Sequence, residues 1–139
     1  MLLLPLVRPP DDDSDGFRLD LFLPAAPQVV GAVRRFLRDL LSSLGLDPGT
    51  ACLLLSELVS NAILHGGVPT VVLELRPGFV YIAVADRAPG ELCARCPELD
   101  STTGRGLFLV DQLADEWGVE EIDSYGKAVW ALAPTPAAA

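Results

Sequence analysis

The feature that most constrains the fold is an almost wholly apolar run, residues 79–85, which reads FVYIAVA. A Pro77-Gly78 turn separates this run from another β-rich run, residues 71–75, so the two runs predict a hairpin. A strand that is apolar on both faces is expected in the middle of a sheet. The chain is therefore expected to supply further strands around this hairpin.

The sequence contains three further strand patterns. Residues 17–23 alternate between apolar and polar with a period close to two, which is typical of a strand with one buried face. Residues 117–122 and 128–132 are β-rich, and a turn-like segment, residues 123–126, separates them. A second hairpin is therefore predicted near the C-terminal end.

Three helices are predicted as well. In residues 28–44 apolar side chains recur every three or four positions, and charged side chains occupy the other side. Asp47 and Pro48 are typical of an N-cap and a first-turn proline, and they predict a second helix that ends near His65. A third, short helix begins near Leu107. Together, the predicted strands and helices indicate an α+β two-layer sandwich, in which a mixed, mostly antiparallel sheet has helices on one face.

The length and the two termini predict the domain organisation. A chain of 139 residues, half of them hydrophobic, is expected to form one core. Residues 1–16 combine prolines with an acidic run, and residues 134–139 contain only Pro, Thr and Ala. We therefore expect one domain, residues 17–133, between a flexible N-terminal tail and a loose C-terminal tail.

The charge balance excludes two classes of partner. Ten Lys and Arg against nineteen Asp and Glu give a net charge of −9, which repels nucleic-acid phosphates and anionic membranes. The apolar opening, residues 2–7, contains a proline and follows no basic stretch, so it is too short for a signal sequence or a membrane span. The sequence thus predicts a cytoplasmic protein that binds neither nucleic acid nor membranes.

The second predicted helix carries a polar stripe. Glu57, Asn61 and His65 are spaced by four residues, so they drift by only ~40° per step around the helix axis. Most of the remaining circumference is apolar, and burying a carboxylate and an amide without partners is costly. The stripe is therefore expected to face a ligand-binding cavity, with an ordinary solvated helix face as the alternative.

Two other features have the chemistry to contact the same ligand. Asp86 ends the most apolar strand, where its carboxylate would accept hydrogen bonds from an exocyclic amine; the alternative is a turn former. Gly104 and Gly106 stand directly before the third helix, where glycines let backbone amides approach a phosphate; the alternative is a tight entry turn. Each feature alone has an ordinary structural explanation. The order and spacing of the polar stripe, Asp86 and the two glycines therefore decide between that explanation and a ligand site.

In this order the three features resemble the N, G1 and G2 boxes of the GHKL ATPase and kinase superfamily. The local sequences SELVSNAILHG at residues 56–66, GRGL at residues 104–107 and GKAVW at residues 126–130 are similar to the stand-alone anti-sigma-factor serine kinases of the RsbW/SpoIIAB type. The resemblance covers residues 17–133. It implies a Bergerat, or histidine-kinase-like ATPase, fold that binds ATP with Mg²⁺.

The resemblance implies a role for each matching side chain. Glu57 matches the general base, and Asn61 matches the Mg²⁺ ligand, since an amide oxygen is a hard donor. Asp86 matches the carboxylate that reads adenine. His65 fits a third position of the N box, where a basic side chain approaches phosphate, although helix capping explains it about as well.

The glycine box supplies further nucleotide contacts that the resemblance implies. The backbone amides of Gly104 and Gly106 would stabilise charge on the transferring phosphoryl group. The kinases often place an arginine just before this box, whereas here an arginine stands between the two glycines. The other residues carried over to the nucleotide site are Gly90, Thr103, Arg105 and Leu107.

The activity that the resemblance implies is transfer of the ATP γ-phosphoryl group to a serine of a STAS-type anti-sigma-factor antagonist, coupled to sequestration of a sigma factor. Such proteins usually pair with themselves, which implies a homodimer. In the G1 box Ala88 replaces a glycine and Pro89 precedes Gly90. This departure favours an alternative, an ATP-binding regulatory module without phosphotransfer, whereas Glu57 favours catalysis.

The three cysteines have a simple explanation. Cys93 and Cys96 form a Cys-x-x-Cys pair, which suits half of a zinc site or a redox pair. Cys52 and His65, the further ligands on offer, are thirteen residues apart on one helix, so about 19 Å separates them along its axis. They cannot jointly complete one site, and we expect reduced thiols.

Overall fold

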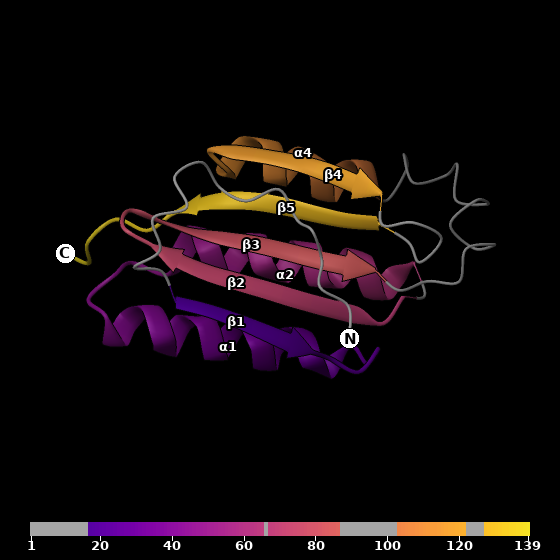
Figure 1. Cartoon of the computed structure of the whole chain (residues 1–139), viewed down its shortest axis with the longest axis horizontal. Coiled ribbons are helices and arrows are strands. Elements are labelled where there is room, and N and C mark those ends of the chain that lie inside the picture. Colours follow the sequence, from indigo (N-terminus) through magenta and orange to yellow (C-terminus); the bar gives the residue numbers. More distant parts are fainter. Residues whose placement is uncertain (1–16, 66, 87–102, 122–126) are drawn as a thin grey trace.

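The computed structural model describes residues 17–65, 67–86, 103–121 and 127–139. Within them a sheet contains the strands β1 (Phe17–Phe22), β2 (Pro69–Arg76), β3 (Phe79–Asp86), β4 (Glu116–Glu121) and β5 (Lys127–Pro134). The strand order is β1-β2-β3-β5-β4, and every neighbouring pair is antiparallel (Figure 1). The apolar strand β3 lies in the middle, as its composition predicts.

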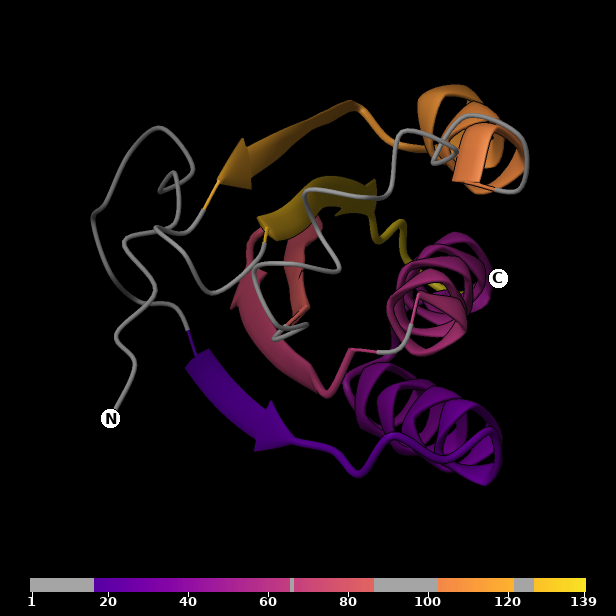
Figure 2. The ribbon, with the colours of Figure 1, turned by 90° about the vertical axis from the view of Figure 1, so that its right-hand side faces the viewer.

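Within the described ranges, three helices form one layer against one face of this sheet (Figure 2): α1 (Gln28–Ser43), α2 (Gly49–Leu64) and α4 (Thr103–Leu113). The middle helix, α2, is buried on most sides because it packs against α1, α4 and the sheet. Between the layers lies an apolar core that includes Leu37, Leu54 and Ile82, each fully buried. The predicted α+β two-layer fold is confirmed, and it is consistent with the Bergerat fold.

Local backbone chemistry explains where the elements end. Gly45 (φ 74°) follows α1, and Gly78 (φ 89°) turns the chain between β2 and β3; both lie in the left-handed region that favours glycine. The Asp47 carboxylate accepts a hydrogen bond from the Gly49 amide at 3.0 Å, at the start of α2. The predicted ends of α1 and of the β2–β3 hairpin are confirmed. The start of α2 differs by one residue from the prediction, because Pro48, and not Asp47, is the N-cap position and Gly49 is the first helical residue.

The C-terminal residues differ from the loose tail that the sequence predicts. The Thr135 amide donates to the Gly78 carbonyl at 3.0 Å, and the Pro136 carbonyl accepts from the Asp47 amide at 2.8 Å. Ala137 forms an isolated antiparallel bridge with Leu46. These backbone hydrogen bonds attach the segment to the α1–α2 connection, an attachment that its Pro- and Ala-rich composition does not indicate.

Several predictions concern parts of the chain outside the described residues. They are the N-terminal tail, Gly90, the pair Cys93 and Cys96, and the turn at residues 123–126. Cys52 is described, and it is buried with a free thiol, as expected. None of the helices that the structure describes has the length and hydropathy of a membrane span.

Candidate functional site

One end of the sheet brings together the ends of several elements. Pro69, the first residue of β2, pairs with Asp86, the last residue of β3, and Asp86 pairs with Lys127, the first residue of β5. Because only residues 65–68 join α2 to β2, the C-terminal end of α2 lies here as well. We call this region the Asp86 end.

Helix α4 starts at the same end. The Asp115 amide, just after α4, donates to the Leu132 carbonyl of β5 at 2.9 Å, which fixes the C-terminus of α4 at the opposite end of the sheet. In Figure 1 the axis of α4 runs roughly parallel to β4 and β5. The 11 residues of α4 rise about 16 Å, which matches the ~17 Å from Leu132 back to Lys127 along β5. The first turn of α4 therefore lies at the Asp86 end.

The polar stripe of α2 is half-buried. Glu57, Asn61 and His65 each have intermediate exposure, whereas the neighbouring side chains Leu54 and Leu58 are buried. The His65 amide donates to the Asn61 carbonyl at 3.2 Å, so these two residues close the helix at the Asp86 end. Intermediate exposure is compatible with both expectations, a face that lines a ligand-binding cavity and an ordinary solvated helix face.

The glycine box lies inside α4, which corrects the prediction that it precedes the helix. Gly104, Arg105 and Gly106 follow Thr103, the first residue of α4. The first four amides of an α-helix have no acceptor within the helix, and the N-terminus carries partial positive charge. The amides that the sequence assigns to a loop are therefore presented by a helix terminus, an arrangement that binds anions.

Lys127 is a residue of this end that the sequence analysis did not assign to the site. It is half-buried and stands opposite Asp86 in the sheet. Val129 and Ala131, at alternate positions of β5, pack into the core under the helices, so Lys127 also takes a position on the helix side. The signal for it was the Gly-Lys pair directly before the last strand.

The donor set at the Asp86 end is suited to a phosphorylated ligand with a cation. Helix-terminal amides bind phosphate oxygens, and Lys127 adds positive charge. Within the described ranges, no group of three or more His, Cys, Asp or Glu side chains is placed to hold a metal ion.

Cys52, one residue of α2 that the resemblance does not use, lies at the other end of that helix. Burial raises the pKa of its thiol, while Arg38 and Arg34 act in the opposite direction. Its Sγ donates to the Arg34 carbonyl at 3.6 Å. The side chain therefore joins α2 to α1 and has no access to the Asp86 end.

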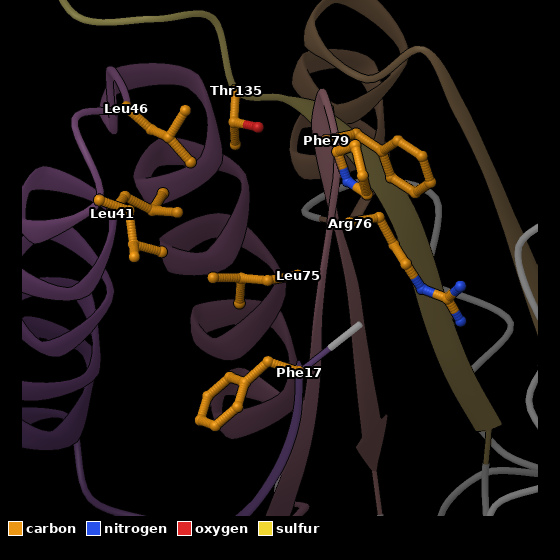
Figure 3. A pocket seen from close by; sticks show the side chains of 9 residues that line it. Phe17, Leu41, Leu46, Leu75, Arg76, Phe79 and Thr135 are labelled. Carbon is orange, nitrogen blue, oxygen red and sulfur yellow. The ribbon is translucent and has the colours of Figure 1, made fainter. Parts of the chain in front are cut away.

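A pocket of about 270 Å³ lies at the opposite end of the sheet (Figure 3). Its lining is mostly apolar and includes Phe17, Leu41, Leu46, Leu75 and Phe79. In Figure 3 the Arg76 guanidinium points away from the leucines, and it pairs with Glu74 at 2.9 Å. Among the described residues that line this pocket there is none of the predicted site residues.

Comparison with known families identifies the domain. The model of a family described as histidine kinase-like ATPase domain matches residues 23–132, a span that contains the polar stripe of α2, Asp86 and the glycine box. No curated protein matches the chain. Because the match covers most of the sequence, the chain belongs to the family of histidine kinase-like ATPase domains.

Proposed function

We propose that the protein is an ATP-dependent serine protein kinase of the anti-sigma-factor type and that the Asp86 end is its nucleotide site. Three segments far apart in the chain support the proposal by ending together there: the stripe of α2, the last residue of β3 and the first turn of α4. This convergence is the observation on which the proposal depends. Family membership adds the expectation of ATP with Mg²⁺.

The residues at this end fit Mg·ATP by their donor chemistry. The Asn61 amide oxygen would hold Mg²⁺, and the first-turn amides of α4, at Gly104 and Gly106, would hold phosphate oxygens. The Asp86 carboxylate would accept a hydrogen bond from the adenine amine. When bound, ATP supplies the phosphoryl group that is transferred.

Glu57 is proposed as the general base. It precedes Asn61 by one helical turn on the same half-buried stripe, so its carboxylate lies on the side of the helix that holds the metal ligand. There it would take the proton from a serine hydroxyl of the substrate. His65, Arg105 and Lys127 would add positive charge for the phosphates.

A regulatory module that binds ATP without transferring it is the second candidate. Ala88 and Pro89, which replace the usual G1 pattern, favour it. Glu57 argues against it, because a sensor needs no carboxylate beside its metal ligand. A transfer assay distinguishes the two candidates, since both bind nucleotide.

The experiment incubates the protein with γ-labelled ATP, Mg²⁺ and a STAS-type antagonist protein that binds it. We expect label on an antagonist serine, and we expect Glu57→Gln to slow the transfer by roughly 10²- to 10⁴-fold, as loss of a general base does. The matched control is Glu116→Gln, an exposed residue at the opposite end of β4. Binding of ATP and antagonist without transfer would establish the regulatory module instead.

The proposed protein partners are the antagonist, a sigma factor and a second copy of the chain. Co-purification with the sigma factor, and its release when unphosphorylated antagonist is added, tests the switch. Light scattering after size exclusion, at several protein concentrations, tests the homodimer. A monomer at all concentrations would remove the homodimer from the proposal and leave the kinase untouched.

A further inference from the structure

The face of the sheet that points away from the helices, which we call the outer face, is apolar at its centre. Val72, Tyr81, Ala83 and Ala128 form a cluster there, and each is at most 1% exposed. Trp130 packs against this cluster. All three described helices lie on the other face (Figure 2). The burial of the outer face therefore requires a cover that no described helix or strand supplies.

The aromatic pair at the centre of the outer face has unsatisfied polar atoms. The rings of Tyr81 and Trp130 are stacked, with centroids 6.2 Å apart. Within the described residues, the Tyr81 hydroxyl and the Trp130 Nε1 are buried without a hydrogen-bond partner. Such groups are costly unless an acceptor reaches them, and an extended segment offers backbone carbonyls. The cover is therefore expected to bring both apolar side chains and backbone acceptors.

The position of the Trp130 ring depends on Gly118 of β4. A Cβ atom at this position would lie 2.7 Å from Trp130 Nε1, so the absence of a side chain lets the indole lie over the neighbouring strand. The outer face thus has a flat aromatic centre. Its β1–β2 side is polar, with ion pairs of 2.9 Å between Arg18 and Asp20 and between Arg76 and Glu74. These charges compensate one another on the β1–β2 side, whereas Glu120 of β4 adds a negative charge near Tyr81. The apolar cluster at the centre therefore offers apolar contact as its main attraction.

We propose that the N-terminal segment, residues 1–16, covers the outer face, with the apolar residues 2–7 lying on Tyr81 and Trp130. Besides the single residue 66, three stretches of the chain lie outside the described residues, and this one has the apolar run MLLLPLV. Residues 87–102 join the Asp86 end to a helix in the other layer, and residues 122–126 are only a hairpin connection. Neither therefore suits the outer face as well.

The length of the chain permits this contact. Phe17, where the N-terminal segment joins β1, pairs with Leu75, and Tyr81 pairs with the adjacent residue Glu74. From β1 to β5 the sheet spans three strand spacings, about 14 Å. The ten residues from Val7 to Phe17 reach up to ~33 Å when extended. The apolar residues 2–7 can therefore reach Tyr81 and Trp130. In this proposal the acidic run, which lies between residue 7 and Phe17, stays over the polar β1–β2 side of the outer face.

The test measures how well Trp130 is shielded from solvent in the full chain. Trp117→Phe leaves Trp130 as the only tryptophan, and acrylamide quenching then reports its exposure. We expect Leu3→Asp with Leu4→Asp to increase the quenching constant by about twofold or more and to shift the emission to the red, since charge is excluded from an apolar contact. Unchanged quenching, or free quenching of Trp130 in the unmodified segment, would overturn the proposal.

Two controls keep the test specific. Asp11→Asn with Asp12→Asn changes the charge of the same segment by two but not its apolar run, so Trp130 should stay shielded. Circular dichroism verifies the fold, and Leu3→Ser with Leu4→Ser replaces the Asp pair if the fold is lost. Shielding that rises with protein concentration, in step with dimer formation, would assign the outer face to a second copy and overturn the proposal. The nucleotide assay is independent of all these outcomes.

Discussion

The two ends of the sheet are built in different ways. At the end opposite Asp86, backbone hydrogen bonds join the β2–β3 turn, the C-terminal residues and the α1–α2 connection, around an apolar pocket. At the Asp86 end, half-buried polar side chains of α2 meet a strand end and the first turn of a helix. Both ends belong to one sheet and share its core.

This difference separates stability from binding. At the first of these ends, short connections and hydrogen-bonded backbone groups stabilise the fold. The other end carries half-buried polar side chains and the first turn of a helix, and these are the groups that the proposed nucleotide site would use for binding. Substitutions at the two ends should therefore affect different measurements, the free energy of unfolding at one end and nucleotide affinity at the other.

Leu41→Ala should cause the largest loss of stability, at the apolar end. Leu41 is fully buried and lines the pocket beside Leu46. Truncation removes its contacts and enlarges an existing void, so we expect about 2–5 kcal/mol less free energy of unfolding in urea titrations. Nucleotide affinity of the folded fraction should not change. A Leu41→Ala protein that is stable but no longer binds ATP would contradict the separation of the two ends.

Asn61→Ala should weaken nucleotide binding and leave the free energy of unfolding nearly unchanged. The half-buried amide is proposed to hold Mg²⁺, so its loss should weaken Mg·ATP binding by roughly tenfold or more, about 1.4 kcal/mol, in calorimetric titrations. The free energy of unfolding without nucleotide should change by much less, because the side chain is not in the core. Ser42→Ala, an exposed substitution on α1, is the matched control. Equal affinity in the two variants would remove Asn61 from the site.

Gly78→Ala should reduce stability by about 1–2 kcal/mol, because φ is 89° and an L-residue is strained there. No atom lies within 4 Å of the added Cβ, so the effect is conformational and not steric. Thermal unfolding of the variant measures it. An unchanged melting temperature of Gly78→Ala would show that position 78 does not need the left-handed backbone conformation.

Tyr81→Phe should have the smallest effect, a change in how stability depends on pH at alkaline pH. Burial raises the pKa of its hydroxyl above the ordinary value of 10.0. Above that value the unfolded chain loses the proton and the folded chain keeps it, so stability falls as pH rises. Tyr81→Phe should make this alkaline fall shallower, as measured by urea unfolding between about pH 9 and 11. An unchanged slope would mean that the outer face is open to water.

Much of the fold could be predicted from the sequence because hydrophobic period and turn chemistry are local. The hairpin around Gly78 and the amphipathic α1 are examples, since each depends on residues close together in the chain. The start of α4 was predicted too late because glycines disfavour helix interiors, yet a first turn at a helix terminus tolerates them. The local pattern does not distinguish a glycine loop from a glycine-containing first turn.

The candidate site was predicted less completely. The spacing of Glu57, Asn61 and His65 indicates one helix face, but the half-burial of that face depends on how α2 packs between its neighbours. Lys127 was missed because its position opposite Asp86 follows from strand pairing over about forty residues of chain. The attachment of the C-terminal residues is also a long-range contact, with no local signal in an Ala- and Pro-rich segment.

Hydrogen–deuterium exchange of the full chain, with and without Mg²⁺ and a non-hydrolysable ATP analogue, tests the central claim most directly. The account predicts that the analogue slows exchange in the C-terminal half of α2, at the end of β3 and in the first turn of α4, while the turn at Gly78 and the segment around Thr135 are unchanged. Slower exchange only around Gly78 and Thr135, or none anywhere at saturating analogue, would contradict it.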